Sequence, residues 1–255
     1  MRTRLWAALW ILLVLAGTEL DAAEPLDSFA RLHQVRLAIH GSLTDLYLLY
    51  EDPHSSSAAL EQRLADATDT IDTLQGLRGT PAQRPWAQLQ TRWRPYREQL
   101  SELGQQQRAQ DAPDLRALSE LLSLNRALLT LCDQLEHRLR QQAAKPPGEL
   151  INRSRAAGLV LQQIASAYAA HSLGANLLGA ADQAPDQLAA DFAEQLVHLQ
   201  VDTPAQQRTL DDIWRKWRFI EGALMHYQGV KVPFVIQQYS SSMIAALERL
   251  GAQGP

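Results

Sequence analysis

The stretch LINRSRAAGLVLQQIASAYAAHSLG, which spans Leu150–Gly174, decides the fold class of this chain. It contains no proline, it ends at a glycine, and its apolar side chains recur at helical spacing, as at Val160, Ile164 and Ala167. That spacing places them on one face of a helix. The stretch therefore predicts a helix that buries this face against other helices. In the simplest interpretation its polar residues lie on the solvated face.

Outward from this helix, the same periodicity recurs between breaks that are rich in proline and glycine. No segment shows the alternation of apolar and polar residues that is typical of strands. Short connections between consecutive helices favour antiparallel neighbours. We therefore expect an all-α fold of up-down helical bundles with no β-sheet. The expected helices are residues 26–51, 60–76, 80–110, 114–143, 150–174, 186–200, 203–229 and 233–250.

The two halves of the chain resemble each other at a displacement of about 124 residues. Trp93 then overlays Trp217, and the capping tetrapeptide Thr-Pro-Ala-Gln occurs at both 80–83 and 203–206. A duplicated four-helix unit is the simplest explanation, either as two tandem bundles or as one extended bundle. The Lys-Pro-Pro-Gly segment at 145–148 is the strongest interruption. The resulting division is a signal peptide at 1–23, a first four-helix module at 24–144 and a second at 149–255.

The N-terminal residues have the three-part layout of a secretory signal peptide. Arg2 and Arg4 precede Leu5–Gly17, an uncharged segment of thirteen residues. A relaxed membrane span needs about 20 residues. We therefore expect cleavage after Ala22 or Ala23 and a periplasmic or secreted protein. Retention of the segment as an uncleaved anchor is the alternative.

Composition and motifs argue against catalysis, metal binding and nucleic-acid binding. The formal net charge is −4, whereas binding to a phosphate backbone needs a basic surface. The chain has one cysteine, Cys132, and no metalloprotease, phosphate-loop or nucleophile-elbow motif. We therefore expect no enzyme, no cofactor and no metal site. Cys132 is expected to be a small buried hydrophobic residue.

Two further clusters have both a functional and a structural interpretation. His33 and His40 lie seven residues apart with Arg36 between them and can share a helix face, but a partly solvated stripe is the favoured interpretation. The Trp-Arg segments around Trp93 and Trp217 resemble surfaces that stack on bases or lie at a membrane interface. Both tryptophans fall on an apolar seam, so core packing is favoured.

Within the stretch quoted first, Ile151, Asn152, Gln162 and Tyr168 stand in a recognisable order. This order is similar to the first helix of PilJ-type sensor domains, the periplasmic N-terminal parts of type IV pilus chemotaxis transducers. Those domains are related to the nitrate-sensing parts of NarX-type kinases, in which basic residues of this helix contact the anion. The resemblance implies a helical sensor domain.

The departures from the family pattern concern the ligand. Gly158 and Gln163 stand where the family helix has arginines, so the resemblance implies the scaffold with weak or no affinity for nitrate. If a small anion or carboxylate binds, we expect it near Asn152, Arg155 and Gln162, since arginine and helix N-terminal amides favour anions. The structural alternative is that Asn152 caps the helix and Arg155 faces water.

The function that the resemblance implies is that of a non-enzymatic extracytoplasmic sensor or binding module. It would act through a membrane signalling or envelope protein, since no second membrane helix or signalling domain follows in the sequence. The resembled family commonly dimerises, so a homodimer is also implied. The alternative is a structural or adaptor helical protein of the cell envelope that binds no small molecule. A sensor needs a cavity with converging polar groups in the second module, whereas an adaptor is packed to ordinary interior density.

Overall fold

The computed structural model describes residues 3–52, 56–106, 114–175 and 183–252. Within these ranges the chain forms eight α-helices, one 3-10 helix and no strand, so the predicted all-α fold is confirmed. The end of the third expected helix, 107–110, and the end of the second module, 253–255, lie outside the described residues. The helices are α1 (Thr3–Glu51), α2 (Ala58–Thr73), η1 (Leu74–Leu77), α3 (Gln83–Gln106), α4 (Leu115–Gln142), α5 (Glu149–Ser172), α6 (Pro185–Val197), α7 (Pro204–Met225) and α8 (Pro233–Ala252).

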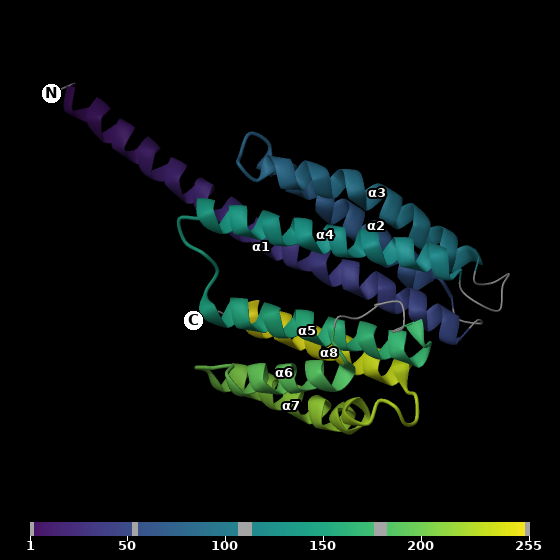
Figure 1. Cartoon of the computed structure of the whole chain (residues 1–255). Helices are drawn as coiled ribbons and strands as arrows, with labels where there is room; N and C mark the ends of the chain where they lie inside the picture. Colours follow the sequence, from purple (N-terminus) through teal and green to yellow (C-terminus); the bar gives the residue numbers. More distant parts are fainter. Residues whose placement is uncertain (1–2, 53–55, 107–113, 176–182, 253–255) are drawn as a thin grey trace.

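The first four helices form one bundle, in which α2, α3 and α4 pack on α1 (Figure 1). Trp86, Leu89, Trp93 and Tyr96 of α3 are buried at helical spacing, as their sequence predicts. Cys132 of α4 is buried in the same apolar core, which confirms its expected position. The buried core of this bundle therefore consists of the apolar positions that helical spacing predicts.

A buried polar network lies inside this apolar core. Tyr96 OH lies 2.9 Å from Ser42 Oγ and donates to the Ile39 carbonyl oxygen at 3.1 Å. Asn125 Nδ2 donates to Tyr96 OH at 2.8 Å. A shift of α1, α3 or α4 along its axis would leave these buried groups without partners. The network therefore sets the register of three helices, which is a usual role of a small polar residue in an apolar seam.

The last four helices form the second bundle, in which α6 and α8 pack on α5, and α7 packs on α6 and α8. Phe192 and Trp217 meet in its core with ring centroids 4.6 Å apart. Trp217 is fully buried, as predicted, whereas Trp214 is only partly buried. The predicted cap of α7 is present. Thr203 Oγ1 accepts a hydrogen bond from Gln206 N at 3.2 Å, and Gln206 Oε1 accepts one from Thr203 N at 3.0 Å.

The first copy of the capping tetrapeptide makes different contacts, and the predicted start of the third helix at Thr80 is wrong. α3 begins at Gln83, three residues later. Thr80 Oγ1 donates to the Leu77 carbonyl oxygen at 2.7 Å, and Gln83 Oε1 accepts from Gly79 N at 2.7 Å. The cause is the 3-10 helix η1 and Gly79 at φ 79°, which turn the chain before α3. The internal duplication stays a prediction.

The two bundles meet along α1 and α5, which pack directly on each other, and α8 also contacts α1 (Figure 1). Small side chains such as Ala157 and Ala165 occupy buried positions of α5. Leu37 of α1 belongs to the apolar core of the second bundle, whereas Ala169 and Ala170 of α5 belong to that of the first. The stretch that decides the fold class is therefore the helix that joins the two bundles.

The predicted leader is helical and continuous with the first bundle. α1 runs from Thr3 to Glu51 without interruption, so the helix expected at 26–51 begins at Thr3 instead. Among the described helices, none combines the length and the apolar character that a membrane crossing requires. Cleavage after Ala22 or Ala23 stays a prediction.

Candidate functional site

A cavity of about 150 Å³ lies where α1, α4 and α5 meet, at the junction of the two bundles. Three stripes of side chains line it, each at the spacing that places residues on one helix face. α1 and α5 each contribute four residues in the pattern i, i+3, i+4, i+7, and α4 contributes two residues one turn apart. The lining residues are Phe29, Leu32, His33, Arg36, Glu136, Arg140, Asn152, Arg155, Ala156 and Leu159.

Glu136 carries the one carboxylate of this lining, and two arginines bind it. Arg36 pairs with Glu136 through Nη1 and with Asp133 through Nη2, and Arg140 Nη2 lies 2.6 Å from Glu136 Oε1. Burial opposes the ionisation of Glu136, but the two arginines outweigh it and hold the pKa of this carboxyl below its ordinary value. Arg36 and Arg140 therefore already have an anionic partner.

Arg155 differs from these arginines, because its half-buried guanidinium makes no ion pair or hydrogen bond within the described part of the chain. Burial lowers the pKa of Arg155, while Glu136 and Glu248 oppose this through space. Partial burial of a cation costs free energy unless an anion or water solvates it. A guanidinium can hold a carboxylate with two parallel hydrogen bonds. Arg155 is therefore the group through which this cavity can bind an anion.

His33 completes the site, and its burial shows that the predicted partly solvated histidine stripe is wrong at this position. It is 7% exposed, because other helices cover this face of α1, and its Nε2 has no hydrogen-bond partner among the described residues. Burial, followed by the charges of Arg155 and Arg36, lowers the pKa of His33 to about 4. The ring is therefore neutral at neutral pH. His40 is half-buried and does not line the cavity.

Two of the three residues predicted for the site, Asn152 and Arg155, line this cavity. Asn152 Nδ2 donates to the Pro147 carbonyl oxygen at 2.8 Å, and Arg140 Nη2 donates to Asn152 Oδ1 at 3.4 Å. Gly148 occupies the N-cap of α5, so the alternative in which Asn152 caps the helix is wrong. Asn152 instead fastens the connection between α4 and α5 to the start of α5.

Gln162, the third predicted residue, lies away from the cavity. It is buried, and its Nε2 donates to Thr44 Oγ1 of α1 at 3.1 Å. Ten residues of helix separate it from Asn152, which corresponds to about 15 Å along the axis. Gln162 therefore links the two bundles, and the interpretation that places it on a solvated face is wrong.

The residues that α1 and α4 contribute to the site were not predicted from the sequence. His33 and Arg36 follow Phe29 at the spacing of a buried face, which is a signal that this stripe is covered. Glu136 carries no such signal, because a glutamate one turn from arginines also suits a solvated face. Spacing within one helix cannot indicate which stripes of three helices meet.

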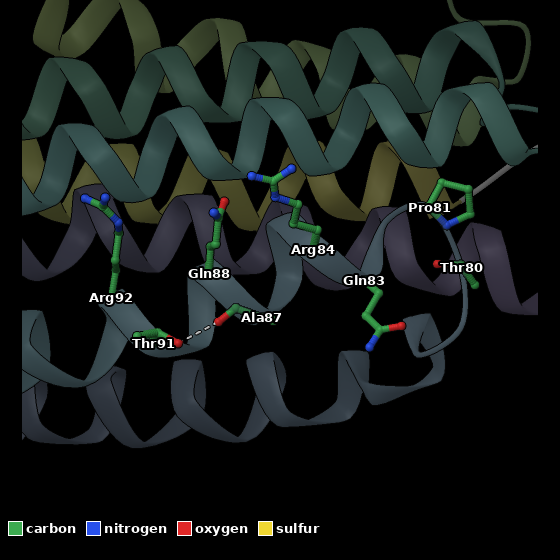
Figure 2. A pocket seen from close by; sticks show the side chains of 8 residues that line it. All are labelled: Thr80, Pro81, Gln83, Arg84, Ala87, Gln88, Thr91 and Arg92. Atoms are coloured by element: carbon green, nitrogen blue, oxygen red, sulfur yellow. Dashed lines mark hydrogen bonds between the residues drawn. The ribbon is translucent and has the colours of Figure 1, made fainter.

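A larger hollow of about 610 Å³ lies over the start of α3 (Figure 2). Figure 2 shows Arg84, Gln88 and Arg92 extending from the same side of the helix, one turn apart. All three are exposed, so water already solvates their polar groups. We interpret this hollow as a solvated helix face and assign no site to it.

Comparison of the chain with protein-family models, curated proteins and solved structures gives no match. The class of this protein is therefore defined by its own fold and site. It is an all-α protein of two packed four-helix bundles with an arginine-lined cavity at their junction.

Proposed function

We propose that this protein is a non-enzymatic, extracytoplasmic sensor or binding module that binds a small anion or carboxylate in the α1–α4–α5 cavity. The observation that carries this proposal is Arg155, a half-buried guanidinium on a cavity wall without an anionic partner among the described residues. His33 lines the same cavity, and its Nε2 has no hydrogen-bond partner among the described residues. Arg155 gains a partner when an anion enters, which gives binding a physical cause.

The charge of the lining favours an anion over a cation. Three arginines and one glutamate line the cavity, and His33 is neutral, so the lining carries a formal charge of about +2. Two carboxylates outside the lining offset this formal charge, since Asp133 pairs with Arg36 and Glu248 acts on Arg155 through space. Anion affinity therefore depends on Arg155, and Glu248 moderates it.

The resemblance of α5 to PilJ-type sensor helices supports the same placement. Gly158 stands where that family has an arginine, and a Cβ at this position would lie 3.9 Å from both Cε1 and Nε2 of His33. A neutral histidine of α1 thus lies beside the position from which the resembled helix projects a cation. This difference is the physical reason to expect weak or no binding of nitrate.

The position of the cavity suits a sensor. Its lining comes from α1 and α4 of the first bundle and from α5 of the second. An anion that bridges them favours one arrangement of the two bundles, and a ligand shifts populations when its affinity differs between two arrangements. In our proposal a membrane signalling or envelope protein responds to this shift, and the chain acts in the periplasm as a homodimer.

Calorimetric titration of nitrate, nitrite, acetate and benzoate into the full chain tests the proposal. We expect a carboxylate to bind the wild type and to lose its binding in Arg155→Gln. Arg153→Gln is the matched control, because Arg153 is exposed on the same helix and pairs with Glu149 outside the cavity. Failure of every anion to bind the wild type at millimolar concentration, or equal binding by Arg155→Gln, would refute it.

A structural or adaptor role in the cell envelope is the second candidate, and one observation favours it. Large apolar side chains on α7 and on the connection to α8 are exposed, among them Phe219 at 64% and Val230 at 85%. Phe219 stacks on Tyr239 with ring centroids 4.6 Å apart. An exposed apolar face of this kind is a frequent feature of protein-binding surfaces. This role gains support if no anion binds and an envelope protein is retained by the wild type but not by Phe219→Ser.

A further inference from the structure

We infer that the ligand of the cavity is a compact monocarboxylate with an apolar body of roughly four to six carbon atoms. This inference rests on the proposed anion site. The carboxylate pairs with Arg155, and the body lies against Phe29, Leu32 and Leu159. Three features of the lining carry it: the number of cations that lack a partner, the apolar part of the wall and the volume.

Only one cation of the lining lacks an ion-pair partner among the described residues and can pair with a ligand. Arg36 and Arg140 already bind Glu136, whereas Arg155 makes no direct ion pair within the described residues. One carboxylate satisfies Arg155 with two parallel hydrogen bonds. A second carboxylate on the same ligand would approach Glu136 and be repelled. The charges therefore select a monoanion.

The rest of the wall is apolar. Phe29 and Leu32 of α1 are buried, and Leu159 of α5 is partly buried beside them on the cavity. An inorganic anion or acetate would leave these side chains facing a void or water, which forfeits dispersion and hydrophobic contact. An apolar body that covers them gains about tenfold in affinity for roughly every two methylene groups buried.

The volume limits the size of that body. An apolar cavity of about 150 Å³ in another protein holds one benzene molecule. The cavity described here has about the same volume, 150 Å³, and must also hold the carboxylate. A molecule of the size of benzoate or of a short branched acid fills it, whereas nitrate or acetate fills only part of it.

Calorimetry on the full chain with five probes tests the inference. Benzoate carries both a carboxylate and an apolar body. Acetate and nitrate lack the apolar body, and benzamide lacks the negative charge. Succinate carries a second carboxylate. We expect benzoate to bind at least about tenfold more tightly than each of the other four. Leu159→Ala is expected to weaken benzoate by at least about threefold and to leave acetate unchanged. Val160→Ala, at the next residue of α5 and outside the cavity, is the control and leaves both unchanged.

The outcomes separate the inference from the proposed function. Equal affinity for acetate and benzoate, with both lost in Arg155→Gln, overturns the inference and leaves the anion site in place. Tighter binding of succinate than of benzoate overturns it as well. Benzamide that binds as tightly as benzoate, or no response to any probe, overturns both. The comparison of benzoate with acetate, succinate and benzamide uses the wild type alone, so the inference can be overturned even where a variant fails to fold.

Discussion

We expect a moderate drop in pH to destabilise this protein through one residue, His33. It is 7% exposed, and burial, together with Arg155 and Arg36, lowers its pKa from 6.5 to about 4 in the folded chain. As the pH falls from neutral, the unfolded chain therefore takes up this proton before the folded chain does. The stabilisation is fully present above pH 6.5 and is lost as the pH falls toward 4. Within this window the free energy of unfolding rises with pH.

The size of the effect follows from these two pKa values. Proton linkage between a pKa of 6.5 in the unfolded chain and about 4 in the folded chain lowers the free energy of unfolding by about 2 kcal/mol from roughly pH 7.5 to roughly pH 5. Typical folded proteins have a total of about 5–15 kcal/mol, so this loss is readily measured. Below about pH 5 carboxylates titrate as well, and the effect of His33 is no longer separate.

Urea unfolding followed by circular dichroism at several pH values from about 7.5 to about 5 measures this loss. His33→Gln removes the titration and keeps a neutral polar side chain, so its stability is expected to fall by about 2 kcal/mol less than that of the wild type. His137→Gln is the matched control, because His137 is exposed on α4, and it keeps the wild-type profile. If the wild type and His33→Gln lose the same free energy of unfolding, a buried neutral His33 is refuted.

The polar network, the second core and the leader each provide a further test. Tyr96→Phe removes the hydroxyl that the network shares and is expected to lower the free energy of unfolding by about 1–3 kcal/mol, whereas no loss would contradict its role in register. Trp217→Ala is expected to cost about 3–5 kcal/mol in urea unfolding, and Trp214→Ala less, so the reverse order would contradict the core assignment. Intact-mass measurement of the exported chain is expected to show cleavage after Ala22 or Ala23, and an uncleaved chain would support the anchor alternative.

The helices and their buried faces could be predicted because helical periodicity is a local property of the sequence. The apolar seam of α3 and the cap of α7 are examples in which a few neighbouring residues determine the structure. The start of α3 could not be predicted in the same way. Burial of Leu74 and Leu77 in the first bundle holds the 3-10 helix before it, and burial depends on contacts with distant residues. The same four letters, Thr-Pro-Ala-Gln, therefore cap one helix and not the other.

α1 is buried on two sides, which the prediction of one apolar face on this helix did not include. Residues 41–49 are all buried, although a bundle helix with one apolar seam buries about two positions per heptad. α1 is covered by the first bundle and also by α5 and α8 of the second. The nearly continuous run of apolar residues around Leu46 is the signal of this two-sided burial. Thr44, a polar residue in this run, accepts a hydrogen bond from Gln162 of α5 across the junction.

Only the residues of the candidate site that lie on α5 could be predicted from the sequence. Arg155 can be identified because the resemblance draws attention to its helix, and the same reasoning wrongly adds Gln162. A polar side chain on a helix has the same sequence signature whether it faces a ligand, water or another helix. The predicted partly solvated stripe is wrong at His33, because the sequence does not state that α4 and α5 cover this part of α1. Sites built between helices that are distant in sequence require the tertiary contacts.

In the proposed function, processing of the predicted leader decides how a bound anion is reported to a membrane. α1 runs unbroken from Thr3 into the cavity-lining segment 29–36. If the leader is retained, it is continuous with the helix that holds His33, and in the proposed function an anion in the cavity acts on that helix directly. If it is cleaved after Ala22 or Ala23, α1 begins about one and a half turns before the cavity, and the signal must leave through a protein partner. The N-terminus of the exported chain therefore separates a self-anchored sensor from a periplasmic module that depends on a second protein.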